Sequence, residues 1–278
     1  MFLRPGSLNE ALEALAQTHG TILSGGTDLF PATTASQLPG TVIDISRISE
    51  LRGIQFSEGA IRIGARTTWT EVASAPLPPG FDGLRAAARE IGGIQIQNQG
   101  TVGGNICNAS PAADGVAALI ALDAEVTLAS HTASRTIPVA DFIQGNRTTA
   151  RQSHEILSSV QIPRHWDNAA SSFLKLGARR YLVISIVMVA ANLLVSRGGV
   201  SKAAICVGSC SSKALRLRAL ERALVGASPS TQLSRLIQPE HFSGLSPIDD
   251  VRATAAYRRE ASQTLVRRAI EECAQKAH

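Results

Sequence analysis

The sequence predicts an α+β fold with two domains, the second a small α+β domain built on an antiparallel sheet. First, the chain has 278 residues, a length typical of two domains. Second, a short polar segment at 163–171 separates two stretches that each contain strand and helix patterns. Third, the later stretch has three strand patterns followed by two helix patterns, an order that favours an antiparallel sheet. We therefore expect domains at 1–165 and 166–278.

The first part of the chain alternates short apolar runs with helical patterns. Ser7 and Glu10 have the spacing of a capping box, and the apolar residues behind them predict a helix that ends at Gly20. Elsewhere, short runs rich in β-branched residues predict strands, and apolar residues three or four apart predict helices. The expected strands are 21–23, 42–45, 60–64, 125–128, 135–139 and 154–162, and the expected helices are 67–73, 84–91 and 114–122.

The part after residue 165 opens with strands and closes with helices. We expect strands at 172–177, 183–195 and 202–207. Leu215 and Leu220 supply an inner face for a helix at 213–225. A last helix, rich in Arg and Glu, is expected at 249–277.

The composition is that of a globular protein, and it argues against a nucleic-acid partner. Hydrophobic residues make up 44% of the chain and charged residues 18%. Aromatic residues, at 4%, are too few for a surface that stacks single-stranded nucleic acid. The net charge of +5 is spread along the chain, so it favours an anionic ligand or an acidic partner protein instead.

Neither a metal site nor a membrane span is expected in this chain. The four cysteines form no C-x-x-C pair and have no histidine cluster near them, so we expect reduced thiols. The N-terminus lacks the apolar core of a signal peptide. The longest apolar run, 181–195, is too short to cross a bilayer. These features predict a cytoplasmic protein.

A first glycine-rich loop, Ser24-Gly25-Gly26-Thr27-Asp28, follows the expected strand at 21–23. Adjacent glycines let backbone N–H groups converge on one point, which makes a nest for an anion such as a pyrophosphate. The spacing from Gly20 to Gly25 resembles a P-loop, but Gly26 stands where a P-loop has its lysine. No G-x-G-x-x-G occurs in the chain, so a Rossmann fingerprint is missing.

A second glycine-rich segment, Thr101-Val102-Gly103-Gly104-Asn105, is the reason to expect a ligand. Two separated glycine segments suit one extended diphosphate ligand that is held from both sides. Ser110 and Asp114 add polar groups that could face a ribityl or ribose hydroxyl. The alternative is a pair of unrelated turns followed by a helix whose N-cap is Asp114.

The chain resembles the FAD-binding medium subunit of the molybdenum hydroxylases, the family of xanthine dehydrogenases, aldehyde oxidoreductases and aerobic carbon monoxide dehydrogenase. The matching segments run in order through nearly the whole chain. They are Gly25-Gly26-Thr27-Asp28-Leu29, Val42-Ile43-Asp44-Ile45, Leu51-Arg52-Gly53-Ile54, Thr101-Val102-Gly103-Gly104-Asn105-Ile106, Ala109-Ser110-Pro111-Ala112-Ala113-Asp114, Gly145-Asn146-Arg147-Thr148, Glu155-Ile156-Leu157 and Phe173-x-Lys175-x3-Arg179-Arg180.

This resemblance implies a two-lobed FAD-binding domain of the vanillyl-alcohol-oxidase-like type, with lobes at about 1–55 and 56–165, and a small C-terminal α+β domain. It also implies that backbone N–H groups of both glycine segments hold the FAD diphosphate. The implied FAD-binding residues are Leu23, Ser24, Gly25, Gly26, Thr27, Asp28, Leu29, Thr101, Gly103, Gly104, Asn105, Asp114, Ile156, Leu157 and Lys175. Together with Ser110, they make a predicted site of sixteen residues.

Lys175 has a specific role under this resemblance. A cation beside the N1/O2 edge of a flavin stabilises the anionic reduced ring and raises its potential. Without the resemblance, Lys175 reads as a solvated strand lysine. The stretch after Arg180 departs from the family, since Tyr181-Leu182-Val183-Ile184-Ser185 has no carboxylate where many relatives have an Asp-Ile-Ala pattern. The departure weakens any expectation of NAD as electron acceptor, and Tyr181 is either a cover for the flavin or a core residue.

The function implied is that of an electron-transfer subunit without catalytic acid, base or nucleophile. A small partner with two 2Fe-2S clusters would reduce the FAD, and a large partner with the molybdenum cofactor would oxidise the substrate, in a dimer of heterotrimers. Two other interpretations stay open: a stand-alone flavin oxidoreductase of the same fold, and a non-catalytic nucleotide-binding module.

Overall fold

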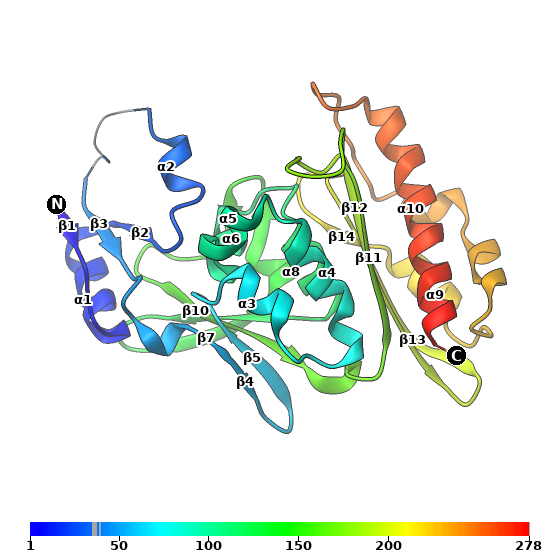
Figure 1. The fold of residues 1–278 in the computed structure, drawn as a ribbon, viewed down its shortest axis with the longest axis horizontal. Coiled ribbons are helices and arrows are strands. Elements are labelled where there is room, and N and C mark those ends of the chain that lie inside the picture. Colours follow the sequence, from blue (N-terminus) through cyan, green and yellow to red (C-terminus); the bar gives the residue numbers. More distant parts are fainter. Residues whose placement is uncertain (35–37, 39, 278) are drawn as a thin grey trace.

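The computed structural model describes residues 1–34, 38 and 40–277, and it confirms the α+β class. Figure 1 shows three groups of elements in a row: a small N-terminal lobe, a central lobe with helices over its sheet, and a C-terminal sheet backed by helices. Among the described residues, no helix is long and apolar enough to cross a membrane.

The N-terminal lobe is a parallel three-stranded sheet in the order β1-β3-β2, with one helix packed against it. Its elements are β1 (Phe2–Leu3), α1 (Leu8–Thr18), β2 (Thr21–Leu23), α2 (Leu29–Ala32) and β3 (Val42–Asp44). The Ser7 hydroxyl caps α1 by accepting from the N–H of Glu10, as predicted. The Glu10 carboxylate, however, accepts from the N–H of Gly6, and α1 ends before Gly20 because His19 turns left-handed at φ 49°.

The central lobe is built on an antiparallel five-stranded sheet in the order β4-β5-β10-β6-β7. Its strands are β4 (Ile54–Phe56), β5 (Ala60–Gly64), β6 (Glu125–Ala129), β7 (Ser134–Pro138) and β10 (Ile156–Pro163), and a hairpin of β8 (Ile143–Gly145) and β9 (Thr148–Thr149) lies outside that sheet. Its helices are α3 (Trp69–Ser74), α4 (Asp82–Glu90), α5 (Ile94–Gln99), α6 (Val102–Asn108), α7 (Asp114–Ala121) and α8 (Val139–Phe142), with 3₁₀ turns at Ser49–Leu51, Pro79–Phe81 and Arg164–Trp166.

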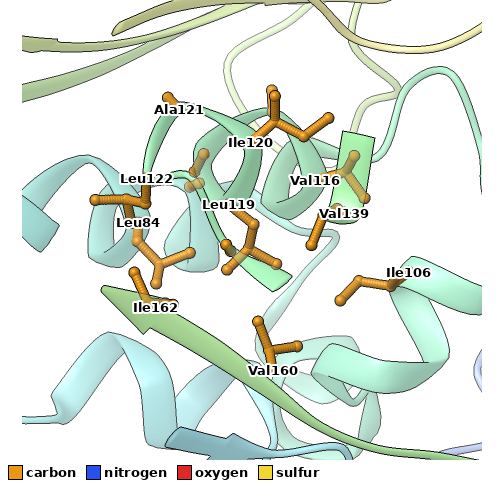
Figure 2. Close-up of a cluster of buried hydrophobic side chains, with 14 of the residues drawn as sticks. Leu84, Ile106, Val116, Leu119, Ile120, Ala121, Leu122, Val139, Val160 and Ile162 are labelled. Carbon is orange, nitrogen blue, oxygen red and sulfur yellow. The ribbon is translucent and has the colours of Figure 1, made fainter. Parts of the chain in front are cut away.

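Helix α7 is the centre of the main core, since all of its residues are buried. Figure 2 shows side chains of α4, α6, α7 and β10 converging around it, among them Leu84, Ile106, Leu119 and Val160. Full burial of one such aliphatic side chain stabilises the fold by about 1.5–3 kcal/mol. This core fixes the positions of α6 and β10 relative to each other.

The C-terminal part is an antiparallel sheet in the order β11-β12-β13-β14. Its elements are β11 (Ala170–Leu176), β12 (Val187–Ser196), β13 (Gly199–Gly208), β14 (Leu215–Arg216), α9 (Arg218–Leu224) and α10 (Ala255–Lys276), with 3₁₀ turns at Thr231–Leu236 and Pro239–Phe242. Alternate residues of β12 join different cores: Met188 and Ala190 pack with the central lobe, while Val187 and Val189 pack with α9 and α10. Because one core joins both parts of the chain, the boundary at residues 165 and 166 stays a prediction.

Three predicted elements of this part begin four or more residues later than expected. The strand expected at 183–195 begins only at Val187, because the Ser185 side chain turns inward to bond Asp114. The helix expected at 213–225 begins at Arg218, because the residues before it form β14 at the sheet edge. The last helix begins at Ala255, where the Thr254 hydroxyl caps it, rather than at residue 249.

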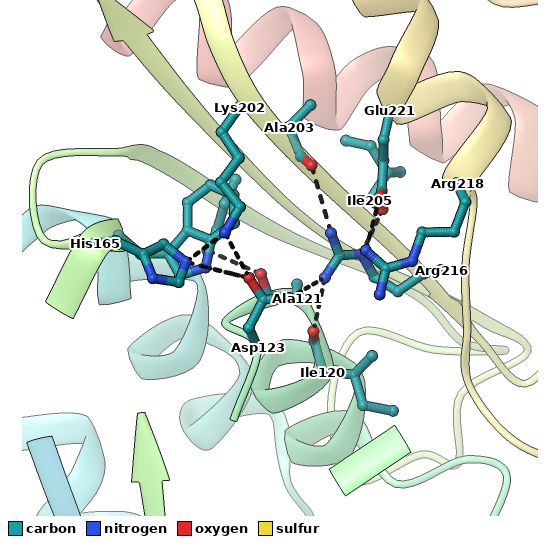
Figure 3. A network of polar contacts seen from close by, with 12 residues as sticks. Ile120, Ala121, Asp123, His165, Lys202, Ala203, Ile205, Arg216, Arg218 and Glu221 are labelled. Atoms are coloured by element: carbon teal, nitrogen blue, oxygen red, sulfur yellow. Dashed lines mark hydrogen bonds and ion pairs between the residues drawn. The ribbon is translucent and has the colours of Figure 1, made fainter. Parts of the chain in front are cut away.

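The contact between the central lobe and the C-terminal sheet has a polar network around Asp123, shown in Figure 3. The Asp123 carboxylate accepts hydrogen bonds from Arg216 at 2.9 Å and from Lys202 and the Trp166 indole at 3.0 Å each. Burial alone would raise the pKa of Asp123, but the Lys202 hydrogen bond and the charges of Arg216 and Lys202 outweigh it and lower the pKa to about 2.

Replacing this carboxylate should therefore change the pH dependence of stability. A pKa lowered from 3.8 to about 2 contributes roughly 2 kcal/mol, fully present above about pH 4 and lost as the pH falls towards 2. We expect Asp123→Asn to lower the free energy of unfolding at neutral pH by roughly that amount and to flatten its decline in acid. Urea denaturation at several pH values measures both effects. Asp141→Asn, at an exposed position on α8, is the control, and equal curves for the two variants would contradict the prediction.

Candidate functional site

A cavity of about 630 Å³ lies between the loop after β2 and the start of α6. This volume is within the range of about 300–1,000 Å³ that is typical of small-molecule and cofactor sites. Thirteen of the sixteen predicted site residues line it: Leu23, Ser24, Gly25, Gly26, Thr27, Asp28, Leu29, Thr101, Gly103, Gly104, Asn105, Ile156 and Leu157. The other three, Ser110, Asp114 and Lys175, are not among the lining residues.

The loop after β2 presents a row of free donors. Strand β2 is held by β3 as far as Leu23, whose carbonyl accepts from the N–H of Ile45. The five backbone N–H groups from Ser24 to Asp28 then have no acceptor among the described residues. Gly26 makes this turn possible, because its φ of +73° is unfavourable for other residues. Converging free N–H groups form an anion-binding nest.

The loop is pressed against the central lobe. A Cβ at Gly25 would lie 2.0 Å from the carbonyl oxygen of Gln99, so only glycine allows this approach. The hydroxyls of Ser24 and Thr101 lie 3.2 Å apart, within hydrogen-bonding distance, across the same junction. These contacts join the two glycine segments into one wall of the cavity.

The second glycine segment is the first turn of a helix, so its assignment as a loop is wrong, while its role in binding the diphosphate stays a prediction. Thr101 is the N-cap of α6, and its hydroxyl accepts from the N–H of Gly104. The N–H groups of Val102 and Gly103 donate to carbonyl oxygens of Thr67 and Ala65. The N–H groups from Val102 to Asn105 are therefore occupied within the protein, whereas the N–H of Thr101 has no acceptor among the described residues. Its buried Asn105 Oδ1 has no hydrogen-bond partner in the described part of the chain, which fits a polar ligand at this position.

A salt bridge closes the far end of the first loop. Both guanidinium NH2 groups of Arg147 donate to the Asp28 carboxylate, at 3.0 and 3.1 Å. The same guanidinium donates to Asn108 Oδ1 at 2.7 Å, so the hairpin of β8 and β9 ties the loop to the end of α6. Arg147 was not among the predicted site residues, although the matching segment at 145–148 contained it.

Asp114 and Lys175 form a buried ion pair away from the cavity wall. Their side chains are 6% and 7% exposed and lie 2.6 Å apart, so Lys175 is not a solvated strand lysine. The Lys175 ammonium also donates to the carbonyl of Glu90, and the Ser185 hydroxyl donates to Asp114. Burial raises the pKa of Asp114, while Lys175 and Ser185 oppose that shift. The N-cap of α7 is Ala113 rather than Asp114.

Ser110, a predicted site residue, lies outside the cavity wall. Its hydroxyl accepts from the N–H of Ala112 and so stabilises a turn.

Cys107 and Tyr181 were not among the predicted site residues. Cys107 lines the cavity, and burial raises the pKa of its thiol to about 11, which keeps it protonated and unreactive. Tyr181 is 67% exposed and does not line the cavity, so it is not a core residue. Within the described residues, no group of three or more His, Cys, Asp or Glu side chains could hold a metal ion.

The chain matches two protein families along its length. Residues 1–165 match the FAD binding domain in molybdopterin dehydrogenase, and residues 172–273 match the CO dehydrogenase flavoprotein C-terminal domain. The chain is 33% identical to the nicotinate dehydrogenase FAD-subunit of Eubacterium barkeri, over 94% of this chain and 92% of that one. It is 28% identical to the carbon monoxide dehydrogenase medium chain of Hydrogenophaga pseudoflava, over 96% and 94%.

Solved structures show the same likeness. A chain of the reconstituted CO dehydrogenase from Oligotropha carboxidovorans superposes with a TM-score of 0.92 at 26% identity, covering 99% of this chain and 98% of that one. A chain of quinoline 2-oxidoreductase from Pseudomonas putida 86 gives a TM-score of 0.88 at 25% identity, with 99% and 97% covered.

Filling the cavity at α6 should remove the cofactor without unfolding the protein. Gly104 is exposed and lines the cavity, and the nearest atom to an added Cβ is Thr101 Oγ1, at 2.9 Å. We expect Gly104→Val to weaken FAD binding by tenfold or more, a rough estimate from the cost of overpacking. The melting temperature should fall only slightly, because the one group that must shift is the Thr101 hydroxyl that caps α6. Fluorescence titration and thermal melting test this. Gly59→Val, in an open hairpin turn, is the control, and undiminished FAD affinity in Gly104→Val would rule out the cavity as the FAD site.

Breaking the buried ion pair should destabilise the fold. Lys175→Met leaves the Asp114 carboxylate buried without its countercharge, which should cost about 3–5 kcal/mol in the free energy of unfolding. Replacing both partners, with Asp114→Leu and Lys175→Met together, should recover most of the lost free energy of unfolding, because no buried charge then lacks a partner. Urea denaturation provides the measurement, and a loss below about 1 kcal/mol in the single variant would show that the pair is not structural. If Lys175 also contacts FAD, the double variant will fold and still bind FAD weakly.

Proposed function

The chain belongs to the FAD-binding flavoprotein subunits of the molybdopterin dehydrogenases, and on that basis we propose that it is the electron-transfer subunit of such a complex. It takes electrons from the 2Fe-2S clusters of a small partner subunit and passes them to an external acceptor. A large partner subunit holds the molybdenum cofactor and oxidises the substrate. The observation that carries this proposal is the cavity, whose residues fit FAD and include no catalytic apparatus of their own.

The fit to FAD is supported from two directions. The free N–H groups of the loop from Ser24 to Asp28 suit the diphosphate, and the unpartnered Asn105 Oδ1 suits a hydroxyl or amine of the cofactor. Ile156 and Leu157, at the start of β10, provide an apolar surface for a ring. Bound FAD supplies the ability to accept electrons one at a time or in pairs, while the protein binds, orients and shields it.

The side chains around the cavity support electron transfer rather than acid–base catalysis. Asp28 is the one carboxylate that lines it in the described structure, and Arg147 pairs with that group. His19 is the one histidine there, and it serves as the left-handed C-cap of α1. No group in this set is placed to remove a proton from a substrate carbon.

An exposed apolar surface lies beside α5, whose Ile96 lines the cavity. Tyr181, Leu182 and Ile184 are all more than half exposed, and Leu182 lies against Gly93 next to the exposed Ile94 on α5. Exposed apolar side chains gathered beside a cofactor site are typical of protein interfaces. We assign this surface to a partner subunit of the complex, which we expect to be a dimer of heterotrimers.

The relatives favour a complex over the stand-alone alternative. This chain covers nearly all of several relatives that are themselves named as subunits or medium chains of dehydrogenases. The same names argue against a non-catalytic nucleotide-binding module. A cytoplasmic location is supported by the four free cysteines, Cys107, Cys206, Cys210 and Cys273, since reduced thiols are typical of that compartment.

Two measurements test the proposed function. The full chain reconstituted with FAD should retain one flavin per chain and show its visible absorption. When the chain is produced with the products of neighbouring genes, it should purify in a complex that contains iron, sulfide and molybdenum. Anaerobic addition of the oxidisable substrate should then bleach the flavin band in the complex but not in the isolated chain. Bleaching in the isolated chain would instead support the stand-alone enzyme.

A further inference from the structure

Two arginines lie near the cavity, Arg147 in the turn between β8 and β9 and Arg151 just after β9. They differ in whether a carboxylate neutralises them. Arg147 is neutralised by Asp28, as described above. Arg151 lines the cavity and forms no ion pair with any carboxylate in the described residues. A guanidinium keeps its charge at all physiological pH values. Arg151 therefore brings an uncompensated positive charge to the cavity.

The surroundings of Arg151 explain why its charge stays uncompensated. The nearest acid in sequence, Glu155, is held by Arg135 through two hydrogen bonds of 2.6 and 2.9 Å, and it also accepts from the N–H of Gln152. The Arg151 guanidinium donates instead to two backbone carbonyls, those of Gln152 at 3.1 Å and Glu155 at 2.8 Å. Both bonds use the same NH2 group, so the remaining N–H donors stay available to a ligand.

The charge balance of the cavity favours an anion. Its one lining carboxylate, Asp28, is paired, and the permanently charged cation among the lining residues of the described chain is Arg151. Apolar walls such as Ile45 and Leu157 reduce the screening of that charge by water. Fixed guanidinium donors match phosphate oxygens well, because the planar group offers two parallel N–H bonds.

We propose that Arg151 is a phosphate-binding residue of this cavity, which recognises the diphosphate of the bound cofactor and so discriminates phosphorylated from unphosphorylated flavins. The proposal rests on the FAD site described above and adds to it a cationic side chain. The nest after β2 would contact the diphosphate through backbone N–H groups, and Arg151 would supply the charge that these groups lack.

The test compares ligands that differ in phosphate, on the full chain. We expect Arg151→Met to weaken binding of FAD and of ADP by roughly 10- to 100-fold, the range for losing a charge-assisted hydrogen bond. Riboflavin, which has no phosphate, should bind the variant and the wild type with affinities within about twofold of each other. Arg151→Lys, which keeps the charge but not the paired donors, should bind FAD with intermediate affinity. Flavin fluorescence and competition by ADP give these affinities.

Two controls make the result specific. Arg62→Met removes the same charge from β5, outside the cavity, and should leave FAD affinity unchanged. The affinity of the wild type for FAD should fall as NaCl rises, and this dependence should be weaker in Arg151→Met. If circular dichroism shows that Arg151→Met folds poorly, two other measurements still test the proposal. They are the dependence of wild-type FAD affinity on NaCl and the FAD affinity of Arg151→Lys.

Three outcomes would overturn the proposal. They are an unchanged FAD affinity in Arg151→Met, an equal loss of affinity for FAD and for riboflavin in that variant, and a wild-type FAD affinity that does not depend on salt. An equal loss would mean that Arg151 shapes the cavity rather than binding phosphate. Failure of the wild-type chain to bind FAD at all would refute the proposed function instead, so the two failures are distinguishable.

Discussion

The close approach of the backbone at Gly25 to the carbonyl of Gln99 is the constraint on which the cavity depends. It brings a loop of the parallel N-terminal sheet against the start of α6 in the central lobe, two elements that belong to different sheets. Any side chain at Gly25 would force them apart by overlap with backbone, which cannot rotate away as a side chain can. The free N–H groups from Ser24 to Asp28 are therefore held in place by packing rather than by hydrogen bonds of their own.

Local patterns in the sequence were sufficient for most elements of the fold. Strands such as β5 and β6 and helices such as α1 and α7 lie close to their predicted positions, because each has a clear period and a clear stop signal. Helix α6 escaped prediction because two adjacent glycines disfavour a helix, and here the close contact of Gly103 with Ala65 outweighs that preference. The extended segment at β14 was likewise misread, because its pairing with β13 is a tertiary effect.

The site was predictable where its residues are contiguous and not where it depends on charge partners. The glycine segments are recognisable from their composition, and most of the predicted residues line one cavity. The pairing of Asp114 with Lys175 joins positions 61 residues apart, on α7 and β11, so no local pattern could reveal it. In the same way, the charge that Arg151 brings to the cavity depends on Arg135 binding Glu155, which only the folded chain shows.

The core shared by α4, α7 and the inner face of the C-terminal sheet has an evolutionary consequence. Met188, Ala190 and Cys206 pack in one cluster with residues of the central lobe, so a substitution on either side changes the space available to the other. Recombination that joined the first part of one relative to the last part of another would create cavities or clashes along this seam. The two matched families should therefore be inherited together and vary in concert along this seam.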